Sequence, residues 1–232
     1  MFAGLLIYVW GQRYLPPEPP RAPTSDMPPM RWADHKGTFM VLLAVALSVT
    51  VFRGAYEQVG NTVALWADTG LDRAAGAFII PMTWFQSLNP LLVMLMTPPL
   101  LAYWHRRADA GKDMSPARRM ALGAVVVACA YLLLAAVEWG SGDAKAPWLW
   151  FAIFFAIFTF GELLILPTGL GLFARLAPPR LGATTVAAWY LAIFAGSLSA
   201  GLVGMLWSHM AQAPFFAMLA VIALAAALLL RA

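Results

Sequence analysis

Six apolar blocks of about 20 residues each run through this chain, and they limit its possible folds more than any other feature. A helix rises about 1.5 Å per residue, so a block of this length crosses the roughly 30 Å hydrocarbon core of a membrane. The blocks predict membrane-spanning helices at residues 38–66, 78–104, 117–138, 147–172, 183–207 and 212–230. We therefore expect an all-α integral membrane protein built as a six-helix bundle.

The composition of the chain does not fit a soluble protein. Hydrophobic residues make up 62% of the chain and charged residues 11%, against roughly a half and a quarter in soluble proteins. A membrane-spanning strand would alternate apolar and polar residues, whereas stretches such as 217–230 are apolar on every side. Both observations favour helices in a lipid bilayer.

Lys and Arg residues are concentrated in alternate connections, above all in the stretch 106–119. Twelve of the fifteen basic residues fall on one side of the predicted membrane. Positively charged loops stay in the cytoplasm, so we expect the C-terminus there. This bias explains the net charge of +4, and no nucleic-acid partner is expected.

The first 37 residues differ from the rest of the chain. Residues 1–11 are apolar but span about half a bilayer, and they lack the basic start and cleavage site of a signal peptide. We interpret them as the stub of a preceding transmembrane helix. Residues 12–37 are rich in proline and fit a cytoplasmic linker, and residues 38–232 hold the six-helix transmembrane bundle. This is the layout around the middle of a twelve-helix transporter.

Three ionisable residues lie at membrane depth, where each charge is costly: Arg53, Glu57 and Glu162. In a continuous helix, Arg53, Glu57 and Asn61 would share one face, flanked by Tyr56. On this face, Arg53 and Glu57 form an ion pair that neutralises two charges, or the polar residues line a water-filled path. The two interpretations can hold together.

Glu162 has no basic neighbour on its own helix, and Pro167 follows it. Its carboxyl group therefore binds a ligand or proton, or is hydrogen-bonded to another helix. Gln86 and Asn89 share a face of the second helix, where amides serve either as contacts between helices or as site residues. Trp189 is either packing or the wall of a pocket.

No catalytic or metal-binding residue is predicted. The chain has one cysteine, all three histidines lie in connections, and the acidic residues are scattered. There is no phosphate-binding loop and no serine-hydrolase elbow. A membrane enzyme is therefore not expected.

At these residues the chain resembles the proton-dependent oligopeptide transporters, a branch of the major facilitator superfamily. The matching motifs are Tyr56-Glu-Gln with Gly60-Asn, Trp84-Phe-Gln-Ser-Leu-Asn-Pro, Gly161-Glu-Leu with Pro167-Thr-Gly-Leu, and Leu176-Ala-Pro followed by Trp189. They match the second half of that family in order and spacing, over residues 38–205.

The resemblance implies roles for individual residues. Glu162 would receive the free amino terminus of a peptide, and Asn89 would contact the peptide backbone. Glu57 would pair with a lysine of the first half and gate the outer side, while Trp189 would belong to the pocket. Tyr56 and Gln86 complete the predicted substrate-binding set, and Arg53 and Asn61 join Glu57 as gating or ion-pair residues.

The expected function is therefore the C-terminal half of a proton-coupled di- and tripeptide symporter in a bacterial inner membrane. No cofactor is expected, because the proton gradient supplies the energy. The partners would be the lipid bilayer, short peptides and an N-terminal six-helix half.

Two departures from the family pattern keep alternatives open. Arg53 stands where the family usually has tryptophan, and the E-x-x-E-R motif of its first half is absent from this chain. The alternatives are half of a transporter for an anion, an amino acid or a drug-like compound, or a membrane subunit that does not transport.

Overall fold

The structure is a computed structural model of the chain, and it describes residues 2–14, 35–76, 78–142, 144–178 and 181–231. The chain divides into two units, residues 1–31 and 32–232. In the first unit, α1 (Phe2–Gly11) is followed by a short 3-10 helix, η1 (Gln12–Tyr14). Most of the predicted linker at 12–37 lies outside the described residues, and the predicted domain boundaries stay a prediction.

The second unit contains six helical segments long and apolar enough to cross a membrane, so the described residues confirm the predicted fold class. The first segment consists of α2 (Lys36–Tyr56), the 3-10 helix η4 (Glu57–Gly60) and α3 (Thr62–Gly70). The others are α4 (Met82–Asp109), α5 (Pro116–Ser141), α6 (Trp148–Leu176), α7 (Gly182–Met205) with the 3-10 helix η5 (Leu206–His209), and α8 (Gln212–Leu229).

The predicted membrane span at residues 38–66 lies within one helical segment, Lys36–Gly70, but this segment is not a regular α-helix throughout. The helix tightens into 3-10 geometry at Glu57 and is interrupted at Asn61, whose ψ angle of −96° is not helical. Gly60, which precedes Asn61, is a poor helix former. A 3-10 helix has three residues per turn instead of 3.6, so the side chains beyond the break are rotated from their positions in a continuous α-helix.

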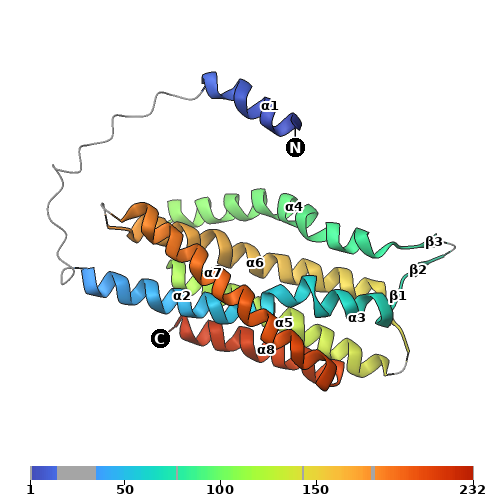
Figure 1. Cartoon of the computed structure of the whole chain (residues 1–232). Coiled ribbons are helices and arrows are strands. Elements are labelled where there is room, and N and C mark those ends of the chain that lie inside the picture. Colours follow the sequence, from blue (N-terminus) through green and yellow to red (C-terminus); the bar gives the residue numbers. More distant parts are fainter. Residues whose placement is uncertain (1, 15–34, 77, 143, 179–180, 232) are drawn as a thin grey trace, which may run out of the picture. The chain divides into compact units, whose positions relative to one another are not determined.

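The helices pack side by side around an aromatic core (Figure 1). α5 contacts α6 and α8, and α2 contacts α7 and α8, whereas α4 packs mainly on α6. The core is rich in buried aromatic rings, including Trp66, Tyr131, Phe154, Phe158 and Phe216. Burial of such large rings is a major source of packing energy.

The backbones of α5 and α6 approach each other closely at two glycines. A Cβ atom at Gly161 would lie 2.8 Å from the carbonyl oxygen of Gly123 and 2.7 Å from a methyl group of Val127. A Cβ atom at Gly123 would likewise lie 2.6 Å from the carbonyl oxygen of Gly161. Both positions therefore need glycine for the two backbones to come this close.

Short strands join the connections at one end of the bundle. β1 (Leu71–Asp72) pairs in parallel with β4 (Ala146–Pro147), so that Leu71 lies opposite Ala146. β2 (Ala74–Ala75) pairs antiparallel with β3 (Phe78–Ile79). The β1–β4 pairing ties the end of α3 to the start of α6.

α4 contains three prolines, at positions 90, 98 and 99. Proline removes a backbone hydrogen bond and bends a helix, and Figure 1 shows α4 curving along its length. Phe85 is the one buried residue of this helix. α4 is thus a bent and loosely covered wall over α6, and the space between the two helices contains the candidate site.

Candidate functional site

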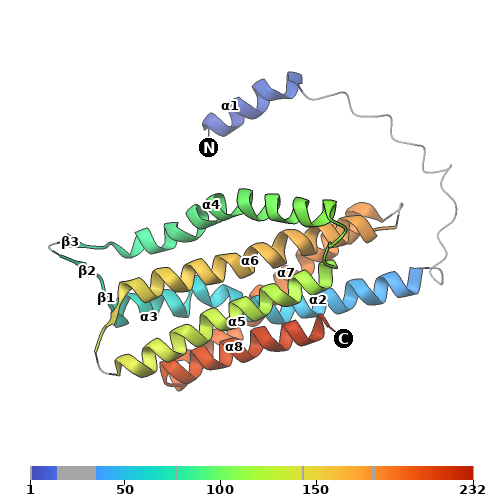
Figure 2. The ribbon, with the colours of Figure 1, turned by 180° about the vertical axis from the view of Figure 1, so that it is seen from behind.

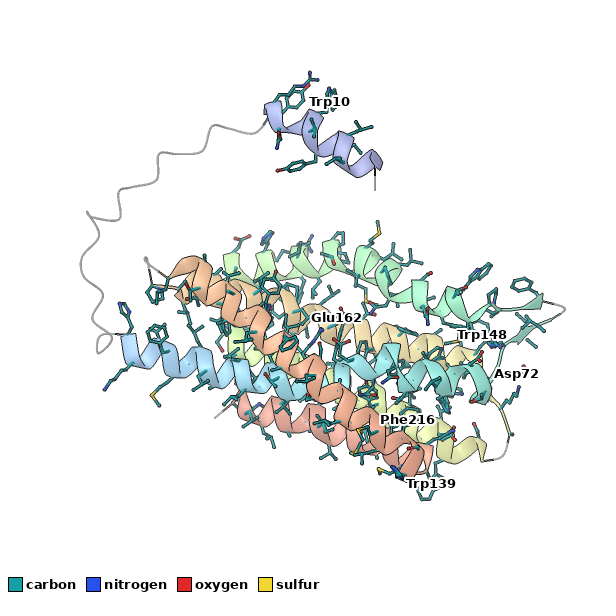
Figure 3. All side chains as sticks on the ribbon, viewed as in Figure 1. Trp10, Asp72, Trp139, Trp148, Glu162 and Phe216 are labelled. Atoms are coloured by element: carbon teal, nitrogen blue, oxygen red, sulfur yellow. The ribbon has the colours of Figure 1, made fainter. Side chains whose placement is uncertain are left out.

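The carboxyl group of Glu162 is the centre of a hydrogen-bonded group contributed by three helices. Oε1 accepts a hydrogen bond of 2.7 Å from the hydroxyl of Tyr56 on α2, and Oε2 accepts one of 3.1 Å from Nδ2 of Asn89 on α4. Figure 3 shows Glu162 near the middle of the bundle, far from Asp72 and Trp148 at one end. The half-buried carboxyl group of Glu162 is thus held in place by two neutral donors.

Neighbouring groups fix these two donors in turn. The Tyr56 ring stacks on Phe158 with ring centroids 5.4 Å apart. The hydroxyl of Thr159 donates to Oδ1 of Asn89 at 3.4 Å, which orients the amide so that its nitrogen faces Glu162. No described Lys or Arg side chain forms an ion pair with Glu162. A carboxylate has about four lone-pair sites, so Glu162 retains the capacity to accept from a cationic ligand.

A cavity of about 740 Å³ opens beside Glu162. Its polar lining comprises Tyr56, Glu57, Gln86, Asn89 and Glu162. Its apolar lining includes rings and aliphatic side chains of α4, α6 and the η4 turn: Val59, Pro90, Val93, Met94, Phe155 and Phe158. Five of the eight predicted site residues therefore share one cavity, and the predicted common face of Gln86 and Asn89 is confirmed.

Arg53 and Glu57 form the predicted ion pair. Ser197 on α7 joins it, because its hydroxyl donates to Oε1 of Glu57 at 3.0 Å and accepts from Nη2 of Arg53 at 3.3 Å. The Arg53 guanidinium also lies 4.7 Å from the centre of the Tyr56 ring. The Arg53 side chain is 13% exposed and does not line the cavity, whereas Glu57 is 34% exposed and does. Arg53 therefore neutralises Glu57 from behind the cavity wall.

We expect this ion pair to be energetically coupled. In the purified chain in detergent, Arg53→Gln and Glu57→Gln should each lower the free energy of unfolding, and the double variant should lose less than their sum by about 1 kcal/mol or more. The exposed pair Arg73–Asp68, whose atoms are 3.4 Å apart, is the matched control and should give a coupling below about 1 kcal/mol. If the losses of unfolding free energy at Arg53 and Glu57 were additive, the two side chains would not be energetically coupled.

Two predicted site residues lie elsewhere. Asn61, at the break between η4 and α3, does not line the cavity and instead lies close to Gly204 of α7. Arg53, Glu57 and Asn61 nevertheless all lie against α7, because the first two contact Ser197 and Asn61 lies beside Gly204. Trp189 is 2% exposed, packs on Phe173 with ring centroids 5.3 Å apart and does not line the cavity. Its predicted contact with substrate stays a prediction.

Buried hydrogen bonds that the sequence did not predict hold the surrounding helices together. Nε2 of Gln58 donates to the carbonyl oxygen of Ala200 at 2.8 Å and links the η4 turn to α7. Nε1 of Trp66 donates to Glu138 at 2.6 Å, so this carboxyl group belongs to the bundle and not to a connection. Gln and Glu are both common in loops, and no local sequence pattern sets Gln58 or Glu138 apart. In the described part of the chain, no group of three His, Cys, Asp or Glu residues is placed to hold a metal ion.

Solved structures with the same arrangement of helices define the class of the protein. A POT family transporter in complex with a thioalcohol-conjugated peptide superposes with a TM-score of 0.78 over 84% of this chain and 41% of that one, at 22% identity. An auto-inhibited POT family peptide transporter gives a TM-score of 0.71 over 85% and 41%, at 26% identity. The chain is an all-α integral membrane protein with the six-helix bundle of a major facilitator superfamily transporter.

Within that class, the chain belongs to the POT family, because the model of that family matches residues 31–223. The peptide transporter YePEPT of Yersinia enterocolitica is 30% identical over 172 residues, which cover 73% of this chain and 34% of that protein. A di-/tripeptide transporter of Lactococcus lactis is 28% identical over 165 residues, which cover 69% and 33%. The chain thus spans about a third of the length of these curated relatives.

Proposed function

We propose that this chain acts as the C-terminal half of a proton-coupled symporter for di- and tripeptides. The observation that carries the proposal is the Glu162 carboxyl group, which lines a cavity without a cationic partner among the described residues. A carboxylate is the natural partner of the ammonium group at a peptide's amino terminus. Names of the curated relatives, such as the di-/tripeptide transporter of Lactococcus lactis, support the same substrate class.

The remaining cavity residues suit the rest of a short peptide. Amides both donate and accept hydrogen bonds, so Gln86 and Asn89 fit the peptide backbone. The apolar part of the lining leaves room for side chains of different shapes, and the volume of about 740 Å³ suits a ligand of a few residues. In this proposal Asn89 and Tyr56 hold Glu162 in the orientation that receives the ammonium group.

The proposed mechanism is alternating access between two six-helix bundles around a site near the middle of the membrane. The N-terminal bundle would contribute the groups that bind the peptide carboxylate and couple transport to protons. The arrangement of basic connections supports a cytoplasmic C-terminus in a bacterial inner membrane. Arg53 is the feature that favours an anion as the alternative substrate. Its charge is compensated by Glu57, and Arg53 itself does not line the cavity, so that alternative loses its main argument.

Uptake into proteoliposomes tests the proposal. Liposomes would contain this chain together with its six-helix partner bundle, with an alkaline interior that drives protons inward. We expect labelled dialanine to accumulate and a protonophore to abolish the accumulation. N-acetyl-dialanine should compete poorly because it has no ammonium group for Glu162, whereas dialanine amide should compete through that group. Uptake that is independent of both the proton gradient and the free amino group would overturn the proposed function.

A further inference from the structure

A second large cavity, of about 750 Å³, lies at the end of the bundle where the α4–α5 connection meets the C-terminal end of α6. Figure 2 shows these two segments at the same end of the unit. Arg119 of α5 and Arg175 of α6 line this cavity, together with Asp113 and Ser115 of the connection. None of its lining residues lines the cavity beside Glu162. The two arginines outnumber the single carboxylate, so the cavity is cationic.

Arg119 has unused hydrogen-bonding capacity. Its Nη2 lies 3.0 Å from Oδ1 of Asp113, and its guanidinium lies 4.0 Å over the ring of Trp104. Its Nε is buried and has no hydrogen-bond partner among the described residues. Arg175 forms no ion pair within the described part of the chain. Unpaired donors of this kind favour an anionic ligand that accepts from both arginines, and a phosphate group does so well.

An apolar groove of about 470 Å³ adjoins this cationic cavity, since Met114 lines both. The groove lies between α4, α5 and α6, and its lining includes Leu100, Leu122 and Phe160. Trp104 connects the two regions, because it lines the groove and carries the Arg119 guanidinium on its ring. A cationic cavity and an apolar groove thus lie next to each other.

We propose that these two regions together hold one anionic phospholipid, with its phosphate between Arg119 and Arg175 and an acyl chain in the groove. On α6, Phe160 and Arg175 are separated by about 22 Å at 1.5 Å per residue. Half of a bilayer's hydrocarbon core is about 15 Å thick, so an acyl chain that reaches the midplane fits this span.

The aromatic residues near the end of α4 also favour a lipid as the ligand. Tyr103 and Trp104, which line the groove, lie near the end of α4. Aromatic rings gather at the membrane interface, and basic pockets between helices on the cytoplasmic side bind anionic headgroups. A free phosphate would use the arginines and leave the groove empty, whereas a lipid uses both. The proposal does not depend on peptide transport.

Native mass spectrometry of the purified chain tests the site with three probes: palmitoyl-oleoyl phosphatidylglycerol, the same chains on phosphatidylethanolamine, and inorganic phosphate. We expect phosphatidylglycerol to be retained about tenfold more strongly than phosphatidylethanolamine, and phosphate alone not to be retained. Phosphatidylethanolamine carries an ammonium group that offsets its phosphate, so the preference depends on the net positive charge of the cavity. Arg175→Gln should remove this preference, because it leaves one arginine, Arg119, beside the carboxylate of Asp113. Arg106→Gln removes an exposed arginine at the end of α4 that lines neither region, and it should leave the preference intact.

A substitution in the groove separates a lipid from a free anion. Leu122→Trp fills the groove without changing charge and should reduce retention of both lipids. Melting temperatures of all variants show whether each remains folded, and Arg175 is exposed, so its replacement should not unfold the chain. Equal retention of the two lipids by the original chain, equal losses in Arg175→Gln and Arg106→Gln, or retention of phosphate alone would each overturn the proposal.

Discussion

Replacing Glu162 by glutamine is expected to weaken peptide binding about tenfold to a hundredfold in the assembled transporter. A hydrogen bond to a charged partner contributes about 1.5–3 kcal/mol, and each 1.4 kcal/mol corresponds to a factor of ten. Glutamine keeps the size of the side chain, and its amide oxygen accepts from Tyr56 or Asn89, so the local structure should persist. The measurement is the dissociation constant for dialanine and the initial rate of uptake.

The control variant is Glu138→Gln. It also converts a carboxyl group within a helix into an amide, but Glu138 accepts from Trp66 and does not line the cavity. Uptake should remain near the original level in this variant. Unchanged dialanine binding in Glu162→Gln, or an equal loss in both variants, would show that Glu162 does not receive the ammonium group.

A methyl group at Gly161 is expected to destabilise the bundle, although alanine is the better helix former. The new Cβ atom would lie 2.8 Å from the Gly123 carbonyl oxygen, so α5 and α6 must separate. Overpacking of this kind costs about 1–3 kcal/mol. The melting temperature of Gly161→Ala in detergent should therefore fall clearly below that of the original chain.

Gly201 on α7 provides the matched comparison, because nothing lies within 4 Å of a Cβ atom there. Gly201→Ala should be neutral or stabilising, since alanine exceeds glycine in helix propensity by about 1 kcal/mol. If the two variants melted at the same temperature, the close contact between α5 and α6 would not determine stability.

The positions of the helices could be predicted from the sequence because the membrane imposes a length on every apolar segment. Predicted and observed boundaries differ by a few residues at most ends. The interruption at Glu57–Asn61 was missed, since the surrounding residues are apolar enough to continue a helix by composition alone. The geometry of that turn depends instead on contacts from other helices, such as the bond of 2.6 Å that Tyr131 donates to the carbonyl oxygen of Ala55.

The candidate site was predictable to the extent that it consists of polar residues in apolar surroundings. Glu162, Asn89 and Glu57 stand out for that reason, and the structure brings them to one cavity. Ser197 does not stand out, because serine is common in membrane helices and its role depends on the distant pair that it contacts. Trp189 stands out in the sequence, but its role could not be predicted, since a large ring among small residues fits either a pocket or a packed core.

The sparse contacts of α4 also bear on how the protein is made. Its main packing partner, α6, follows it in the chain, so α4 leaves the ribosome and enters the lipid before α6 exists. During that interval α4, with its three prolines and its polar side chains Gln86 and Asn89, lacks α6 as a packing partner. Biosynthetic insertion therefore depends on the balance of apolar and polar residues within α4 itself. The number of polar residues that α4 can offer to the cavity is thus limited by the need to insert into the membrane, and not only by the stability of the folded state.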